Sequence, residues 1–304
     1  MRAELHADGG AAAATGEFFR AGEFLRAEKI THTLEAGPLL LPVLVREIPG
    51  APGALDAISP YGYPGATMAG ASVEAGSVDW EATGLVSLFV RDRIRAEPAF
   101  AGGTERSPVQ VHDPSIERSI RPRLLEQVRS NERGGWTVTL SPGPESTESD
   151  RGAFHSLYTQ TMHRTGAGER YLFAPEYFDG ILGFERSWLL TAAAGGTPGA
   201  GAIAAVSDGV LHYYLGGSAD SALDASPFKN VVVAMLDLAD ELGLPLNLGG
   251  GLIPGDGLER FKRGFANAEA PFVTHEIVCD RAEYARLAAG RDEVGAFFPA
   301  YRAP

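Results

Sequence analysis

The chain has 304 residues and a formal net charge of -13, with 26 Lys and Arg against 39 Asp and Glu. A composition of 44% hydrophobic and 21% charged residues is typical of a folded globular protein and excludes a fully disordered chain. The acidic balance argues against a general binder of polyanions such as DNA, because neutralising phosphates requires clustered Lys and Arg. The apolar runs are too short to cross a membrane, and the first residues do not resemble a secretory signal, so we expect a cytoplasmic protein.

The first half of the chain predicts a mixture of short strands and helices. The Pro- and Gly-rich segments 48–53 and 59–65 are expected to be loops, because these residues disfavour helices and regular strands. Pro122 weakens the prediction of a basic helix over 115–131, unless that helix begins later with Pro122 in its first turn. The predicted elements are a helix at 17–29, strands at 31–35, 39–45, 86–90 and 109–112, a helix within 115–131, and a strand at 136–140.

The second half is patterned more clearly. Its strands and helices follow a polar, acidic linker at 141–150, which is the best candidate for a domain boundary. The turn at 207–209 (Ser-Asp-Gly) is a strong hairpin signal. The predicted helices are 151–165, 175–182, 230–242, 257–264 and 281–289, and the predicted strands are 188–193, 201–206, 210–215, 246–248 and 272–278.

This order of elements predicts an α+β (mixed α/β) fold in which a mostly antiparallel sheet is flanked by helices. The first half repeats the order of the second half in a rougher form. We therefore expect two similar domains, residues 16–145 and 150–304, with a cleft between them. Two fused domains can form such a cleft without a second chain, so a monomer is expected.

The standard catalytic signatures are absent from the sequence. It contains no dinucleotide-binding or Walker A motif, no zinc-protease motif and no nucleophile elbow. The single cysteine, Cys279, lies in a predicted strand and is expected to be a buried structural thiol, and no metal site is expected. The lack of an evident nucleophile favours chemistry in which two bound substrates react directly.

Three segments of the second half are candidates for binding. The strand 210–218 leads through a loop to Ser226 and Pro227, where a predicted helix begins and its N-terminus can bind an anion. The structural alternative is that Ser226 is only the N-cap. In the second segment, Gly249, Gly250 and Gly251 follow an apolar strand and expose backbone N–H groups, unless they form only a flexible turn.

The third segment, residues 257–265, places three cations beside two aromatic residues. Arg260, Lys262 and Arg263 form a candidate site for phosphate or carboxylate in an otherwise acidic chain. Phe261 and Phe265 are four residues apart and can face the core, so the segment can serve both packing and binding.

Taken together, these segments resemble the Fem branch of the acyltransferase superfamily that has the GNAT fold. The matching motifs, in order, are 212–218 (His-Tyr-Tyr-Leu-Gly-Gly-Ser), Ser226-Pro227, 248–251 (Leu-Gly-Gly-Gly), and 261–265 with its Phe-Lys pair. In the first half, residues 59–65 (Ser-Pro-Tyr-Gly-Tyr-Pro-Gly) and 89–91 (Phe-Val-Arg) are similar to landmarks of Fem-like proteins.

The resemblance implies two GNAT-like domains and a transferase that needs no protein nucleophile and no cofactor. Fem-type proteins transfer an amino acid from an aminoacyl-tRNA to an amine, in peptidoglycan precursors or, in pacidamycin-type relatives, in a peptidyl nucleoside. The family's active-centre Lys corresponds to Lys262, which would act with the Phe261 backbone. A long helical tRNA-binding arm is not apparent, and residues 92–93 (Asp-Arg) stand where relatives usually continue with His-Pro.

The same resemblance assigns expected roles to the remaining candidates. Contact with tRNA would be limited to its acceptor end, and the acceptor amine would lie in the expected cleft, where aromatic rings can stack on a base or sugar. An acyl-CoA N-acyltransferase and a peptidoglycan-precursor aminoacyltransferase remain as alternatives, together with a non-catalytic ligand-binding protein. The donor-side residues are Arg260, Arg263, Lys229, Ser226, Gly249, Gly250 and Gly251, and the acceptor-side residues are Tyr61, Tyr63, Tyr214 and His212.

Overall fold

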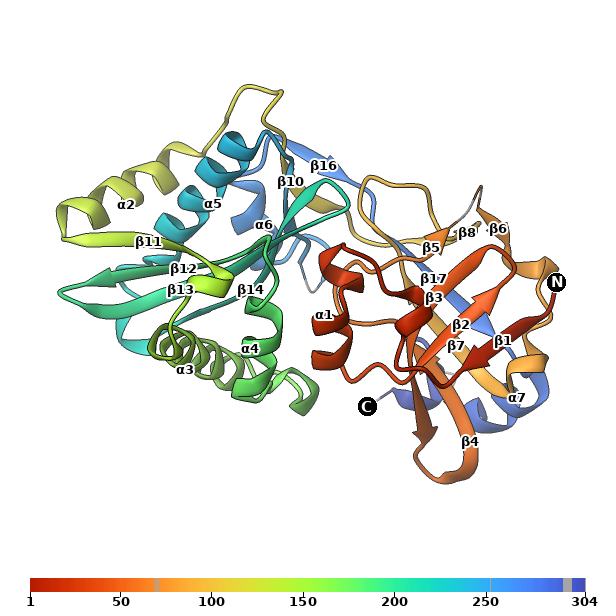
Figure 1. Cartoon of the computed structure of the whole chain (residues 1–304). Helices are drawn as coiled ribbons and strands as arrows, with labels where there is room; N and C mark the ends of the chain where they lie inside the picture. Colours follow the sequence, from red (N-terminus) through yellow and green to blue (C-terminus); the bar gives the residue numbers. More distant parts are fainter. Residues whose placement is uncertain (69, 71, 252, 292–296, 304) are drawn as a thin grey trace. The chain divides into compact units, whose positions relative to one another are not determined.

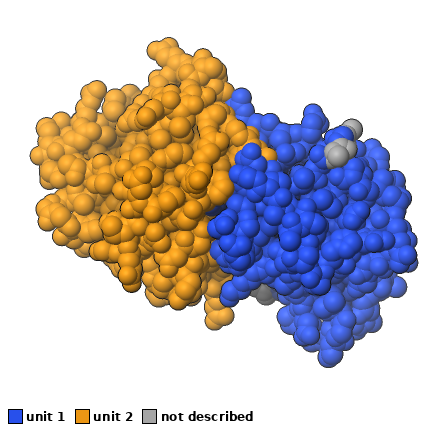
Figure 2. Space-filling model, in the orientation of Figure 1, with its two compact units in different colours: residues 1–106, 271–304 blue, residues 107–270 orange. Residues whose placement is uncertain are grey.

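A computed structural model describes residues 1–68, 70, 72–251, 253–291 and 297–303. The chain forms two compact units, which Figure 2 shows in different colours. Unit 1 contains residues 1–106 and 271–304, and unit 2 contains residues 107–270. Among the described residues, no helix combines the length and the apolar character needed to span a membrane.

Unit 1 is built on an eight-stranded sheet in the order β1-β2-β3-β4-β7-β17-β9, with β5 beside β3, and on a small β6–β8 pair. The hydrophobic core of this unit lies on the central strands and includes Leu34, Leu41, Leu88 and Phe100. The elements are β1 (Ala3–His6), α1 (Gly22–Ala27), β2 (His32–Ala36), β3 (Leu39–Ile48), β4 (Ala51–Ile58), β5 (Thr67–Met68), β6 (Val73–Glu74), β7 (Leu85–Arg91), β8 (Phe100–Ala101), β9 (Thr104–Glu105), β17 (Val273–Val278) and α7 (Arg281–Ala288).

Unit 2 is built on a seven-stranded sheet in the order β11-β12-β13-β14-β15-β10-β16. Figure 1 shows helices α2 and α5 on one face of this sheet and α3 and α4 on the other. The elements are β10 (Val109–His112), α2 (Pro122–Arg133), β11 (Trp136–Pro142), α3 (Glu148–Arg164), α4 (Pro175–Leu182), β12 (Ser187–Ala194), β13 (Thr197–Ser207), β14 (Val210–Ser218), α5 (Phe228–Leu242), β15 (Leu246–Gly249), α6 (Gly257–Arg263) and β16 (Ala268–Ala270).

Short 3-10 turns connect these elements. They are η1 (Ala11–Ala13), η2 (Phe18–Arg20), η3 (Ala75–Ser77), η4 (Glu81–Thr83), η5 (Gly143–Glu145), η6 (Glu169–Tyr171), η7 (Asp220–Ala222) and η8 (Ala300–Arg302).

The predicted fold class is confirmed: both sheets are rich in antiparallel pairs, and helices flank them. Local sequence signals explain many of the boundaries. The β13–β14 hairpin turns at Asp208 and Gly209, both at positive φ, which is the geometry that an Asp-Gly turn favours. Pro122 opens α2 as its first helical residue, and Gly243 ends α5 with a φ of 64°.

The compact units do not follow the division expected at 145–150. β10 precedes that point in sequence, yet it pairs with β15 and β16 of unit 2, and β11 pairs with β12 along its whole length. β17 pairs instead with β7, which returns the last residues of the chain to unit 1. The polar stretch 141–150 is therefore a connection inside unit 2, because hydrogen-bonded strand neighbours, which local composition does not reveal, decide the unit.

Two local predictions for the first half are also wrong. The segment 48–53 is not all loop, because β3 extends to Ile48 and β4 begins at Ala51. Residues 52–54, including Pro52 and Gly53, lie in a register shift between β3 and β4, where the missing proline N–H breaks no ladder bond. The helix expected at 17–29 is reduced to the 3-10 turn η2 and the six-residue α1, because Ala21 between them has an extended backbone.

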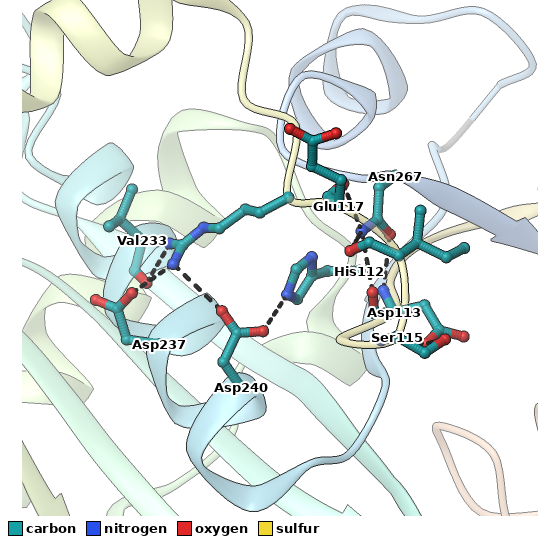
Figure 3. A network of polar contacts seen from close by, with 10 residues as sticks. His112, Asp113, Ser115, Glu117, Val233, Asp237, Asp240 and Asn267 are labelled. Carbon is teal, nitrogen blue, oxygen red and sulfur yellow. Dashed lines mark hydrogen bonds and ion pairs between the residues drawn. The ribbon is translucent and has the colours of Figure 1, made fainter.

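A polar network attaches the end of β10 to α5 (Figure 3). Buried His112 bonds through Nε2 to Asp240 Oδ1 at 2.7 Å, and its Nδ1 has no hydrogen-bond partner. Arg118 bonds to Asp237 Oδ1 at 2.6 Å and reaches Asp240 Oδ2 at 3.4 Å. Asn267 closes the loop after β10 by accepting from the Asp113 N–H. The network holds β10, and therefore its neighbour β15, in place on the α5 face.

Replacing Asp240 should destabilise unit 2. The Asp240→Ala variant leaves buried His112 without its carboxylate partner, which should lower the free energy of unfolding by about 1–3 kcal/mol. The measurement is urea denaturation followed by tryptophan fluorescence, to which Trp136 and Trp188 of unit 2 contribute together with Trp80 of unit 1. Asp237→Ala is the matched control, because it removes only an exposed pair worth about 0–1 kcal/mol. An equal decrease in the free energy of unfolding in the two variants would contradict a stabilising role of the contact between His112 and Asp240.

Candidate functional site

The site in unit 2 begins where two neighbouring parallel strands separate. β14 and β15 are paired only at Leu211 with Leu246 and at His212 with Asn247. Beyond this point the rest of β14 pairs with β13, and Gly249 at the end of β15 pairs with Gln110 of β10. Two strands that share only their first rungs leave backbone N–H and C=O groups available along the diverging edges.

β14 is shaped by a bulge and by two glycines after it. Its register with β13 shifts so that Tyr214 is the extra residue between paired Tyr213 and Leu215. A Cβ on Gly217 would lie 2.5 Å from the backbone of Leu157 on α3. A Cβ on Gly216 would lie 2.5 Å from the Tyr213 hydroxyl. The glycines therefore allow the strand, α3 and the Tyr213 side chain to pack closely.

β15 ends in a tight glycine turn. Gly249 has a φ of 78°, and its N–H donates to the Asn247 Oδ1 at 2.8 Å. A Cβ on Gly251 would lie 2.5 Å from Asp256 Oδ1, so the turn passes directly over the start of α6. Asp256 caps that helix by accepting from the Glu259 N–H at 2.7 Å.

Lys262 is the buried cation of this site. It projects from α6, is 9% exposed, and its Nζ donates to the carbonyl oxygen of Gly250 at 2.8 Å. The same Nζ lies 5.7 Å from the centre of the Tyr213 ring, within the range of a cation–π contact. Burial lowers the pKa of the Lys262 amine to about 8, and the negative charge of Asp256 partly offsets that effect.

This arrangement suits the stabilisation of a developing negative charge. A partly desolvated ammonium acts more strongly on a nearby oxyanion than an exposed one, because water does not screen it. Backbone N–H and C=O groups along the diverging strands are of the donor and acceptor types that the carbonyl and amide groups of a substrate require. An amine with a pKa near 8 can also release and accept a proton close to neutral pH.

The helix predicted at 257–264 is present as α6, and its two neighbouring phenylalanines pack against the core of unit 2. Phe265 is fully buried, and Phe261 is half-buried against the same core, with the two ring centres 5.3 Å apart. Phe261 also packs near Phe228, at the start of α5. Phe261 therefore has a packing role beside Lys262.

The cations that the sequence analysis expects on the donor side occupy different environments. Arg260 is exposed and donates to the Gly255 carbonyl at 2.6 Å. Arg263 pairs with Glu259 and lies 3.5 Å from Glu269, so two carboxylates already compensate its charge. Lys229 lies in the first turn of α5, and burial lowers the pKa of its amine.

Ser226 is not the N-cap of α5. It has a φ of 52°, Pro227 occupies the cap position, and the helix begins at Phe228. Proline takes the cap because its ring restricts φ to the value that leads into a helix. Ser226 instead forms the turn before the helix, and its carbonyl accepts from the Lys229 N–H.

The acceptor-side residues lie in both units. Tyr61 and Tyr63 belong to unit 1; the Tyr63 ring packs edge-on against Phe19 and Phe272. Tyr61 is 36% exposed, and its N–H donates to the Glu28 carboxylate. Gly62 between them has a φ of 97° and lies against Phe19.

In unit 2, Tyr214 is buried, and its hydroxyl bonds to the Tyr177 hydroxyl of α4. His212 is buried and bonded to Asn247, and burial lowers the pKa of its imidazole to about 4. His212 is therefore neutral and in a structural position.

Three residues of the site are absent from the sequence-based candidates. Tyr213 faces the Lys262 ammonium, Asp256 caps α6, and Asn247 bonds both His212 and Gly249. The Asp-x-x-Glu spacing of Asp256 and Glu259 is a helix-start signal that could have identified Asp256. Nothing in the local pattern marks Asn247, whose partners depend on the pairing of β15 with β14.

The two mixed sheets, the separating parallel strands and the flanking helices define a two-unit protein with a GNAT-like fold. No family model matches the chain, and no curated protein matches it in sequence. Similar solved structures share the fold. FemX has a TM-score of 0.61 and 12% identity, and the match covers 92% of this chain and 97% of FemX.

Two further structures are similar at this level. The C-terminal domain of a putative lysylphosphatidylglycerol synthetase from Agrobacterium fabrum has a TM-score of 0.59 and 14% identity over 86% of this chain and 88% of that one. L-PGS from Bacillus licheniformis has a TM-score of 0.55 and 11% identity over 86% and 87%. The similarity to FemX agrees with the sequence resemblance at the level of the fold.

The buried Lys262 should make stability depend on pH. Its pKa is about 8 in the folded protein against an ordinary value of 10.5. Between these two pH values the Lys262 amine is protonated in the unfolded chain and neutral in the folded protein. The free energy of unfolding of the wild type, relative to Lys262→Met, should therefore rise by about 3 kcal/mol between pH 7.5 and 10.5. Urea denaturation of both proteins at several pH values measures this difference. A difference that does not vary with pH would contradict the burial of the charged amine.

The two phenylalanines of α6 and its C-terminal flank should differ in their contribution to stability. Phe265→Ala should lower the free energy of unfolding by about 3–5 kcal/mol, because its whole ring is buried. Phe261→Ala should cost about 1–2 kcal/mol, because part of its ring is exposed in the folded state. Urea denaturation under identical conditions compares the free energies of unfolding of the two variants. A larger decrease for Phe261→Ala than for Phe265→Ala would contradict the assignment of Phe265 as the more deeply buried ring.

Proposed function

We propose that this protein transfers an aminoacyl group from an aminoacyl-tRNA to an amine, forming a peptide bond. The observation that carries the proposal is the desolvated Lys262 ammonium beside the Gly249–Gly251 turn, where β14 and β15 separate. The Fem-like order of motifs in the sequence supports the proposal, and so does a fold shared with FemX over nearly the whole of both chains.

In the proposed reaction, the acceptor amine attacks the ester carbonyl of the donor. The new C–N bond forms as a tetrahedral oxyanion develops, and the Lys262 ammonium stabilises that charge. The ester C–O bond then breaks, and the proton lost by the amine passes to the departing ribose oxygen. A free amine is itself the nucleophile, so no serine or cysteine is required, in agreement with the absence of such motifs.

The proposed donor site favours a tRNA end over coenzyme A. Acyl-CoA enzymes of this fold bind the pyrophosphate with an Arg/Gln-x-x-Gly-x-Gly/Ala run at a helix start, and residues 217–230 lack that run. Here α5 begins with Pro227 as its cap and carries Lys229 in its first turn. Arg260, Lys262 and Arg263 are the other cations proposed to approach the acceptor end of the tRNA.

We propose a peptidyl nucleoside or another specialised metabolite as the acceptor, in a pacidamycin-type reaction. Two features of the sequence support this choice: the segment 59–65 carries Tyr61 and Tyr63, a residue type that can stack on a base or sugar, and the net charge of -13 disfavours a large polyanionic footprint. A peptidoglycan precursor is the alternative acceptor.

The direct test is the choice of donor. The purified protein is incubated separately with radiolabelled aminoacyl-tRNAs and acyl-CoAs, each with a pool of acceptors that contains peptidyl nucleosides, other amines, cell-wall precursors and phosphatidylglycerol. We expect label to leave an aminoacyl-tRNA only, and the product to identify the acceptor. Release from an acyl-CoA only would overturn the proposed donor in favour of an acyl-CoA N-acyltransferase.

Lys262→Ala should lower the transfer rate by about 10²–10³-fold while the protein remains folded, because it removes the charge opposite the oxyanion. Lys29→Ala is the matched control, since Lys29 is an exposed lysine of unit 1. Circular dichroism checks that both variants fold. Transfer by Lys262→Ala at the rate of the control would exclude Lys262 from the chemistry.

A further inference from the structure

A buried pair of polar side chains lies at the last rung shared by β14 and β15. His212 and Asn247 are partners in the parallel ladder, and after them the strands diverge. Their side chains meet at 3.1 Å, between Asn247 Nδ2 and His212 Nδ1. His212 is 2% exposed and Asn247 is fully buried. A hydrogen bond between side chains thus follows directly after the last backbone pairing between these strands.

The hydrogen bonds determine the orientation of both groups. The Gly249 N–H can only donate, so the atom of Asn247 that it meets at 2.8 Å is the carbonyl oxygen Oδ1. The amide nitrogen of Asn247 therefore faces His212 and donates to Nδ1. The proton of the imidazole then lies on Nε2, and the Ser207 backbone accepts a further hydrogen bond from the ring. Since burial keeps the imidazole neutral, Nδ1 stays an acceptor across the working pH range.

Asn247 connects this pair to the reactive lysine. The residue that Asn247 caps, Gly249, begins the turn at positive φ, and the next carbonyl, that of Gly250, accepts from Lys262 Nζ at 2.8 Å. Because the strands separate here, the Gly249 N–H has no partner on β14, and the Asn247 side chain takes that place. The position of the Lys262 acceptor therefore depends on a side chain held by His212.

We propose that His212 and Asn247 are positioning residues, whose mutual hydrogen bond holds the point of strand separation and places the Gly249–Gly251 turn against Lys262. As a statement about catalysis this rests on the proposed acyl transfer. As a statement about the environment of the Lys262 amine it can be tested without any substrate. This assignment replaces contact with the acceptor as the expected role of His212.

The sequence offers a clean measurement, since its three lysines are Lys29, Lys229 and Lys262. Competitive labelling with trace acetic anhydride at a series of pH values, followed by peptide mass spectrometry, gives the pKa of each amine. Exposed Lys29 in unit 1 serves as the internal reference. Asp256 and Tyr213 are the charged and titratable groups already shown beside Lys262, and no variant in this test alters them.

In Asn247→Leu, the turn loses its cap and water reaches the amine. The pKa of Lys262 should then rise by about one unit toward its ordinary value, because burial is the main cause of its depression. His212→Phe removes the acceptor for Asn247 and should act in the same direction. His212→Gln can accept from Asn247 and should restore the wild-type pKa. If Asn247→Leu does not fold, the Lys262 pKa in the two His212 variants tests the proposal.

The matched control is Asp92→Asn. It alters a buried histidine pair of unit 1, His275 with Asp92 at 2.6 Å. We expect no change in the Lys262 pKa. An unchanged or lower Lys262 pKa in folded Asn247→Leu and His212→Phe would overturn the proposal. An equal rise in Asp92→Asn would also overturn it, because general loosening would then explain the effect.

Where transfer is detected, the same variants should lower kcat about tenfold, with His212→Gln close to wild type, because a small displacement of the cation weakens its contact with the oxyanion. Loss of rate without a pKa shift would overturn the positioning role. A pKa shift in a protein that transfers nothing would support the positioning of Lys262 and remove the proposed function alone.

Discussion

The burial of the Lys262 ammonium is the constraint on which the candidate site depends. A charged amine loses its hydration when it is buried, and the loss is tolerable only if fixed groups replace water. Here the Gly250 carbonyl, the Tyr213 ring and the charge of Asp256 replace it. Other parts of unit 2 hold each of these groups in place. The glycine turn positions the Gly250 carbonyl, the bulge in β14 adjoins Tyr213, and Asp256 is the cap of α6.

Strand separation makes room for that contact. Parallel neighbours normally continue their ladder, and breaking it leaves backbone groups without partners. In unit 2 the break is stabilised from both sides, by the pairing of β10 with β15 and by the side-chain bond between His212 and Asn247. The Asp240–His112 contact in turn attaches β10 to α5. The separation of the strands is thus a built feature of the sheet.

Short-range signals predicted the parts of this site that depend on neighbouring residues. The Asp208-Gly209 turn, Pro122 at the start of α2 and Gly243 at the end of α5 each have a local backbone reason. The Phe261-Lys262 pair and the three glycines were recognisable as a motif. The partners of His212 and Tyr214 were not, because an apolar strand pattern does not reveal which strand or helix lies opposite.

The sequence by itself determined the fold class, most elements of unit 2 and Lys262 as the residue of interest, since periodicity, turn residues and an ordered set of motifs are local properties. The tertiary structure alone decided the division into units, because β10 and β17 join strands far away in the chain. It also decided that Asn247, Tyr213 and Asp256 surround Lys262 and that His212 is buried and neutral. Burial and pKa depend on the groups that long-range packing brings together, which residues adjacent in sequence do not specify.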